Sequence, residues 1–248
     1  MVFERWDPPE ATDVSPSRQS SRNPFLAKDS RNGAPLLTLR LILSAMWVTR
    51  LYAILDASSF PNNDALCLAA SELVAGGVTL LQYRNKSGKA REMLDQAREL
   101  KRRLGASVRL IMNDRADLCL AAGFGGVHVG QDDLSPAGVR AVIGNDLWLG
   151  VSTHNPEQLA EADKTSANYL AIGPVFATRS KDNPDPVIGL EGVRRARTLI
   201  RKPLVAIGGI TRENCQSVIA AGADTVAVIS DLIREPRQSA EEFFRILG

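Results

Sequence analysis

The sequence of 248 residues predicts an α/β fold of the (β/α)8 type: a TIM barrel in a single domain with an irregular N-terminal extension. Three observations support this fold class. Short apolar runs alternate with longer helix-like segments, glycines recur where those segments end, and polar residues gather just after the runs. Because the runs are almost continuously apolar, they are typical of strands buried on both faces, as in a parallel sheet covered by helices.

The predicted strands follow one another through the second part of the chain. In order, they span residues 51–55, 78–83, 109–112, 127–129, 147–151, 169–172, 204–207 and 225–229. Eight such units point to a closed barrel. An open doubly wound sheet is the alternative, because periodicity does not show closure, but no glycine fingerprint follows the first strand.

The segments between the strands carry helix signals at both ends. Glycine ends a helix before a strand in residues 75–78, 122–127 and 221–226, since it readily adopts the left-handed conformation. Helix starts are marked by Ser135-Pro136 and by Asn155 with Pro156, where a capping side chain is followed by proline in the first turn.

The N-terminal part of the chain differs from the rest in composition. Residues 1–47 are predicted to form a disordered or loosely packed extension, and residues 48–248 the catalytic barrel. The apolar segment 34–48 contains Arg40 and is too short to span a bilayer. A true start at Met46 is an alternative explanation of the extension.

Charge and cysteine content limit the class of partner. With 30 Lys+Arg against 28 Asp+Glu, no global field attracts nucleic acid or membrane, so we expect any anion site to be local. Charge and composition leave open whether the protein forms a homo-oligomer. The odd number and wide spacing of Cys67, Cys119 and Cys215 favour reduced, packed thiols in a cytoplasmic protein.

The second strand ends in an amide and two cations. Gln82, Arg84 and Lys86 alternate along the strand, so they share the face that points into the barrel mouth. Two inward cations are costly unless an anion meets them, and phosphate or pyrophosphate suits both. A solvated strand end or a salt bridge to Asp114 is the alternative.

Two carboxylates close neighbouring strands. Asp114 and Asp133 are hard oxygen ligands near cationic residues, which suggests Mg²⁺ bridging carboxylates to a pyrophosphate. Asp132 competes for the second position, and capping near the Ser135 helix is the structural alternative.

Other strand ends carry weaker signals. Gly208-Gly209 and Ser230 lie where barrels commonly bind phosphate through backbone N–H groups. His128, flanked by valines, is interpreted as a core histidine, whereas His154 at a strand end is the better functional candidate. No nucleophile elbow, chelating histidine pair or Walker loop supports a hydrolase or ATPase.

Seven motifs in order at successive strand ends carry a family resemblance. They are residues 82–86, 113–115, 126–133, 150–154, 173–181, 206–210 and 226–230. Together they resemble the thiamine phosphate synthase family over about residues 51–248. The resemblance implies a Mg²⁺-dependent transferase of thiamine biosynthesis. It would join 4-amino-2-methyl-5-hydroxymethylpyrimidine diphosphate to 4-methyl-5-(2-hydroxyethyl)thiazole phosphate and release pyrophosphate.

The resemblance also implies roles for individual residues, none of them a covalent nucleophile. Those expected on the pyrimidine diphosphate are Gln82, Arg84, Lys86, Asn113, Ser152 and Lys181; those around the thiazole phosphate are Thr178, Ser180, Gly209, Ile229 and Ser230; Asp114 and Asp133 would carry Mg²⁺. The related thiazole tautomerase, with His154 as acid/base, and a non-catalytic thiazole-phosphate-binding barrel are the alternatives.

Overall fold

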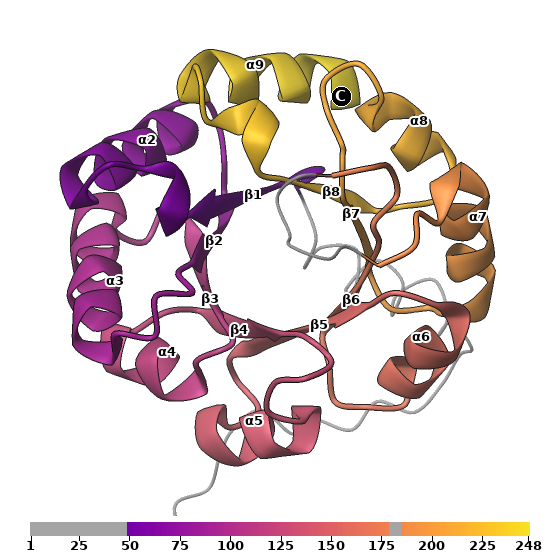
Figure 1. Cartoon of the computed structure of the whole chain (residues 1–248), viewed down its shortest axis with the longest axis horizontal. Helices are drawn as coiled ribbons and strands as arrows, with labels where there is room; N and C mark the ends of the chain where they lie inside the picture. Colours follow the sequence, from indigo (N-terminus) through magenta and orange to yellow (C-terminus); the bar gives the residue numbers. More distant parts are fainter. Residues whose placement is uncertain (1–48, 179–184) are drawn as a thin grey trace, which may run out of the picture. The chain divides into compact units, whose positions relative to one another are not determined.

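The structure, a computed structural model, describes residues 49–178 and 185–248, and within them eight parallel strands close into a barrel in sequence order (Figure 1). The strands are β1 (Leu51–Asp56), β2 (Leu80–Arg84), β3 (Arg109–Asn113), β4 (Gly126–Val129), β5 (Trp148–Thr153), β6 (Tyr169–Ile172), β7 (Leu204–Ile207) and β8 (Thr225–Val228). The prediction of a (β/α)8 barrel is confirmed, and the open-sheet alternative is wrong.

Helices surround the ring of strands, as Figure 1 shows. They are α2 (Asn63–Ala75), α3 (Ala90–Leu104), α4 (Ala116–Ala122), α5 (Pro136–Ile143), α6 (Pro156–Asp163), α7 (Gly189–Leu199), α8 (Cys215–Ala220) and α9 (Pro236–Leu247), with short 3₁₀ helices η1 (Ala57–Ser59) and η2 (Ser230–Leu232) after β1 and β8. None of the helices in the described ranges is long and apolar enough to cross a membrane.

The predicted helix signals act where they were expected. The side chain of Ser135 accepts a hydrogen bond from the Gly138 N–H (3.2 Å), and that of Asn155 accepts one from the Gln158 N–H (2.9 Å). At the other end of a helix, Gly123 has φ +67°, the left-handed conformation expected of a residue that ends α4. These residues mark the starts of α5 and α6 and the end of α4.

The apolar residues form two layers. The larger cluster fills the space between strands and helices, and all three cysteines are buried as free thiols. A second cluster fills the barrel interior and consists of Tyr52, Ile54, Leu80, Ile111, Trp148, Tyr169, Ala171, Val205 and Ala227. Because the interior is packed in this way, a ligand has room only at the end of the barrel.

The predicted N-terminal extension, residues 1–47, lies outside the described residues. Its structure and its boundary with the barrel domain at residue 48 therefore stay predictions.

Candidate active site

A cavity of about 540 Å³ lies at the carboxyl ends of the strands. Every predicted site residue in the described ranges lines it: Gln82, Arg84, Lys86, Asn113, Asp114, Asp133, Ser152, Thr178, Gly209, Ile229 and Ser230. Ser180 and Lys181 lie outside the described residues. The structure thus brings together side chains that are almost 150 positions apart in the sequence, although lining the cavity does not assign a role to any of them.

The cations at the end of β2 are each held by a carboxylate. Arg84 donates from Nη1 to Oδ2 of Asp56, whose other oxygen accepts from the N–H (3.1 Å) and the hydroxyl (2.7 Å) of Ser58. Lys86 donates from Nζ to Oδ2 of Asp114, so the salt bridge considered as an alternative from the sequence is present. The Lys86 side chain is 53% exposed, and an ion pair this open to water contributes little to folding stability.

Asp56 is a site residue that the sequence reasoning missed. It directly follows the apolar run of β1 and is buried, with 5% of its surface exposed. A polar residue at a strand end was the signal that identified the residues after the other strands, so the same signal could have found it. The part it plays here is to hold the Arg84 guanidinium at the cavity wall.

The two predicted metal ligands lie next to each other. Burial raises the pKa of the Asp114 carboxyl, and the neighbouring Asp133 carboxyl raises it further, while Lys86 opposes both. Asp114 also has φ +62°, a conformation that is uncommon for a residue other than glycine and often marks a functional position. Asp133 accepts a hydrogen bond from the Gly130 N–H at 2.7 Å, which fixes the turn that carries it.

The described residues contain no group of three or more His, Cys, Asp or Glu side chains arranged to hold a metal ion. The available ligand set is the Asp114 and Asp133 pair, with Asp132 also lining the cavity. Mg²⁺ is commonly held by one or two carboxylates and completes its shell with water and substrate phosphates, so the pair fits such an ion.

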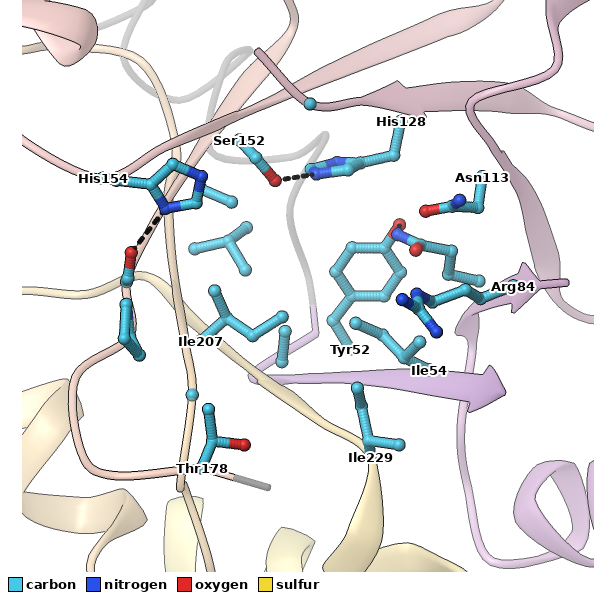
Figure 2. Close-up of a pocket in the computed structure, with 18 of the residues that line it drawn as sticks. Tyr52, Ile54, Arg84, Asn113, His128, Ser152, His154, Thr178, Ile207 and Ile229 are labelled. Atoms are coloured by element: carbon cyan, nitrogen blue, oxygen red, sulfur yellow. Dashed lines mark hydrogen bonds between the residues drawn. The ribbon is translucent and has the colours of Figure 1, made fainter. Parts of the chain in front are cut away.

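A chain of hydrogen bonds crosses the barrel at the cavity and connects Gln82 with Ser152. Gln82 Nε2 lies 2.8 Å from Tyr52 Oη, which lies 2.9 Å from Tyr169 Oη. Tyr169 Oη lies 3.0 Å from His128 Nδ1, and His128 Nε2 lies 2.7 Å from Ser152 Oγ. Figure 2 shows the side chains of His128 and Ser152 pointing toward each other in the pocket that also contains the Tyr52 ring.

His128 is the core histidine that the sequence predicted, because it is buried and both ring nitrogens have partners. Burial lowers its pKa to about 4, so the ring is neutral at pH 7. The prediction was nevertheless incomplete, since the ring also lines the cavity. Tyr52 and Tyr169 were missed because a tyrosine within an apolar strand has the sequence pattern of a core residue.

His154 lies on another wall of the cavity. Its Nδ1 is 2.8 Å from the carbonyl oxygen of Gly173, a contact drawn in Figure 2, and 3.4 Å from Oδ2 of Asp185. Its backbone N–H donates to Gln158 Oε1 at 2.8 Å. The capping at the start of α6 is performed by Asn155, and His154 lines the cavity.

Backbone forms the wall contributed by β7. Gly208 has φ +101° and Gly209 φ +63°, conformations that side-chain-bearing residues rarely adopt. A Cβ at Gly209 would lie 2.4 Å from the Ala177 carbonyl oxygen, and one at Gly208 2.5 Å from Cβ of Pro174. The sequence suggested that these glycines let backbone approach a ligand; the structure adds that they let this turn pack against the segment after β6.

An ion-pair cluster joins that turn to the end of β8. Arg212 donates from its backbone N–H (2.8 Å) and from Nε (3.1 Å) to Oδ2 of Asp231, and from Nη2 (3.1 Å) to the other carboxylate oxygen. It also contacts Glu242 on α9. These contacts fix the Gly209 turn relative to η2, which begins at Ser230.

Fold and cavity together define a class of protein. In a (β/α)8 barrel the active site is built from the carboxyl ends of the strands, often with a phosphate site after the last two. Cations and paired carboxylates at β2–β4, with glycine-rich turns at the other wall, are typical of an enzyme barrel that acts on phosphorylated small molecules.

The chain belongs to the thiamine monophosphate synthase family, whose model matches residues 51–232. It is similar to the thiamine-phosphate synthase of Koribacter versatilis, with 65% identity over 207 residues that cover 82% of this chain and 98% of the relative. The corresponding protein of Chloroflexus aurantiacus is 44% identical over 187 residues, covering 74% and 85%. The family resemblance predicted from the strand-end motifs is confirmed.

A solved structure supports the same assignment. The thiamine phosphate pyrophosphorylase of Pyrococcus furiosus is 33% identical, with a TM-score of 0.71, and the match covers 80% of this chain and 95% of that structure.

Proposed function

We propose that this chain condenses 4-amino-2-methyl-5-hydroxymethylpyrimidine diphosphate with 4-methyl-5-(2-hydroxyethyl)thiazole phosphate, forming thiamine phosphate and releasing pyrophosphate. The observation that carries the proposal is that the strand-end residues of the family motifs line one cavity. No covalent intermediate with the protein is needed: the C–O bond to the diphosphate breaks, and the thiazole nitrogen forms a bond to the same carbon.

The pyrimidine diphosphate, ring and diphosphate together, is assigned to the wall formed by β2–β5. Arg84 and Lys86 supply positive charge there, and Gln82, Asn113, Ser152 and Lys181 complete the assigned set. Support comes from Asn113, whose Nδ2 is buried and has no hydrogen-bond acceptor among the described residues. A buried donor without a partner costs free energy, and a substrate acceptor would satisfy it.

Asp114 and Asp133 would hold Mg²⁺. When bound, the ion supplies positive charge for the oxygens of the departing pyrophosphate. The proximity of the two carboxylates supports this assignment, because like charges in a partly buried site repel each other and a divalent cation would offset that repulsion more than the Lys86 contact with Asp114 alone.

The thiazole phosphate is assigned to the opposite wall. Thr178, Ser180, Gly209, Ile229 and Ser230 form this set, in which backbone N–H groups and hydroxyls would bind the monophosphate. With a phosphate site on each wall, the two substrates are oriented so that the thiazole nitrogen faces the pyrimidine methylene carbon. Such positioning lowers the barrier by fixing the geometry before reaction.

The direct test is formation of product. Purified full-length protein is mixed with both phosphorylated substrates and Mg²⁺, then oxidised, and thiochrome fluorescence is read with a chelator control. Chelator-sensitive fluorescence supports the proposal. Absence of signal with both substrates intact would contradict it and favour the tautomerase or binding-protein alternatives.

We also propose that residues 48–248 form the catalytic domain and residues 1–47 a separate extension, and that the protein acts in the cytoplasm. The composition of the extension and the family match, which begins at residue 51, support the domain boundary.

A further inference from the structure

The hydrogen-bond chain from Gln82 to Ser152 has a direction. An amide nitrogen can only donate, so Gln82 Nε2 donates to Tyr52 Oη. Either hydroxyl can donate in the Tyr52–Tyr169 pair; in the arrangement where each hydroxyl accepts one hydrogen bond and donates one, Tyr52 donates to Tyr169 Oη and Tyr169 donates to His128 Nδ1. In this arrangement each hydroxyl uses its single proton within the series of hydrogen bonds.

The same arrangement sets the protonation of the His128 ring and the role of Ser152 at the other end of the hydrogen-bond chain. Once His128 Nδ1 accepts, the neutral ring carries its proton on Nε2 and donates it to Ser152 Oγ. The Ser152 proton is then left for the cavity, which this residue lines. At the near end, the Gln82 carboxamide has its nitrogen on Tyr52, so its oxygen is the group left to accept from a ligand.

We propose that Tyr52, Tyr169 and His128 are positioning residues that make Gln82 a hydrogen-bond acceptor and Ser152 a hydrogen-bond donor toward the substrate. This inference rests on the proposed function. A pyrimidine with an exocyclic amine offers a donor to Gln82, and its diphosphate offers an acceptor to Ser152. A pyrimidine with an oxo group in place of the amine would place its oxygen, an acceptor, next to the Gln82 side-chain oxygen, also an acceptor. The hydrogen-bond chain therefore favours binding of the aminopyrimidine.

Burial of the two tyrosines maintains the direction of the hydrogen-bond chain. Tyr52 and Tyr169 are 1% and 0% exposed, and their rings pack edge to face with centroids 6.0 Å apart. Water therefore does not compete for the hydroxyls, and reversing the chain would require Gln82 to rotate by half a turn and His128 to change tautomer together. Cooperative chains of this kind change direction as a unit.

The tautomer of His128 is the first test, because it is independent of turnover. The protein contains two histidines, so ¹⁵N-histidine NMR of the full-length protein gives the signals of two imidazole rings. A His154→Gln variant removes one set and so assigns the other to His128. The expected result is a neutral His128 with its proton on Nε2 and an unprotonated Nδ1. A proton on Nδ1 would reverse the chain and overturn the proposal, whether or not the enzyme makes thiamine phosphate.

The second test removes the middle link. Tyr169→Phe is expected to raise the KM for the pyrimidine diphosphate about tenfold, the effect of one lost hydrogen bond, and to leave the KM for the thiazole phosphate within about twofold. The matched control is Tyr83→Phe, because Tyr83 is equally buried but its hydroxyl contacts Gln96 and Asn85 away from the cavity. An unchanged KM for the pyrimidine, or an equal rise for both substrates, overturns the proposal.

The third test reads specificity. Equilibrium binding of the amino substrate is compared with that of its 4-oxo analogue, and the wild type is expected to prefer the amino form at least about tenfold. In Tyr169→Phe the Gln82 amide is released to rotate, so the preference should shrink. Equal binding of both compounds by the wild type would contradict the assigned direction. If the wild type makes no thiamine phosphate at all, the proposed function fails. The tautomer measurement still determines the direction of the hydrogen-bond chain.

Discussion

The two walls of the cavity are built by different means. The charged wall, which comprises Gln82, Arg84, Lys86, Asn113, Asp114 and Asp133 at β2–β4, is built from side chains, and its two cations are held by carboxylates. The backbone wall, which comprises Gly173, Gly208, Gly209 and Ser230 at β6–β8, relies on turns packed against one another. Under the proposed function the difference has a physical reason: a diphosphate needs charge, whereas a monophosphate can be held by backbone N–H groups.

The comparison predicts different failures. Removing a charge from the first wall should change catalysis and leave the fold intact, because the charges are partly exposed. Adding an atom to the second wall should disturb the fold first, because the space is already filled.

The largest expected effect is on the charged wall. Asp133→Asn keeps an acceptor for the Gly130 N–H and removes the charge, so turnover should fall by about 10²–10³-fold while thiazole phosphate still binds. Steady-state kinetics and calorimetric titration measure the two quantities. Asp132→Asn is the matched control; if it, and not Asp133→Asn, lost turnover, the metal position would belong to Asp132.

The backbone wall should break by destabilisation. Gly209→Ala places a Cβ 2.4 Å from the Ala177 carbonyl oxygen at φ +63°, so we expect a loss of about 3 kcal/mol in the free energy of unfolding. Gly123→Ala is the control, since φ is +67° there but the Cβ would meet nothing within 4 Å. Its cost should be only about 1 kcal/mol. Urea denaturation that gave equal losses would show that the close packing of this wall is unimportant.

Between the walls, His128 makes stability depend on pH. Its folded pKa of about 4 lies below the reference 6.5, so the unfolded chain binds more protons between these values and stability falls as pH falls. From pH 7 to pH 5 the expected loss is about 2 kcal/mol, measured by urea denaturation. His128→Gln should flatten this slope. A slope equal to that of the wild type would assign the pH dependence to other groups.

Lys86→Ala should separate binding from folding. We expect the KM for the pyrimidine diphosphate to rise about tenfold, while the free energy of unfolding changes by less than about 1 kcal/mol because the ion pair is exposed. Lys89→Ala, which removes a surface pair with Glu92 at 3.5 Å, is the control and should alter neither quantity. An unaffected KM in Lys86→Ala would remove this residue from the diphosphate site.

The smallest effect is expected from the extension. Deleting residues 1–47 should leave kcat and both KM values within about twofold, because the family match starts at residue 51. Kinetics of the shortened chain measure this directly, and a large loss of activity would place part of the extension in the catalytic unit.

Most of the charged wall could be predicted from the sequence, because its residues directly follow apolar runs and the carboxyl ends of parallel strands meet at one end of a barrel. The hydrogen-bond chain through Tyr52 and Tyr169 could not be predicted from the sequence. Tyr52 and Tyr169 are 117 positions apart and meet only because the barrel closes, and each has the local pattern of a core residue. The sequence also explained only in part why glycine occupies positions 208 and 209, since their packing partners come from the segment after β6.

The most direct test of the account is ³¹P NMR of the reaction mixture with full-length protein, both substrates and Mg²⁺. The account predicts that the diphosphate resonances of the pyrimidine disappear while pyrophosphate and thiamine phosphate appear in equal amounts. Release of pyrophosphate without thiamine phosphate, or persistence of both substrates, would contradict condensation at this cavity.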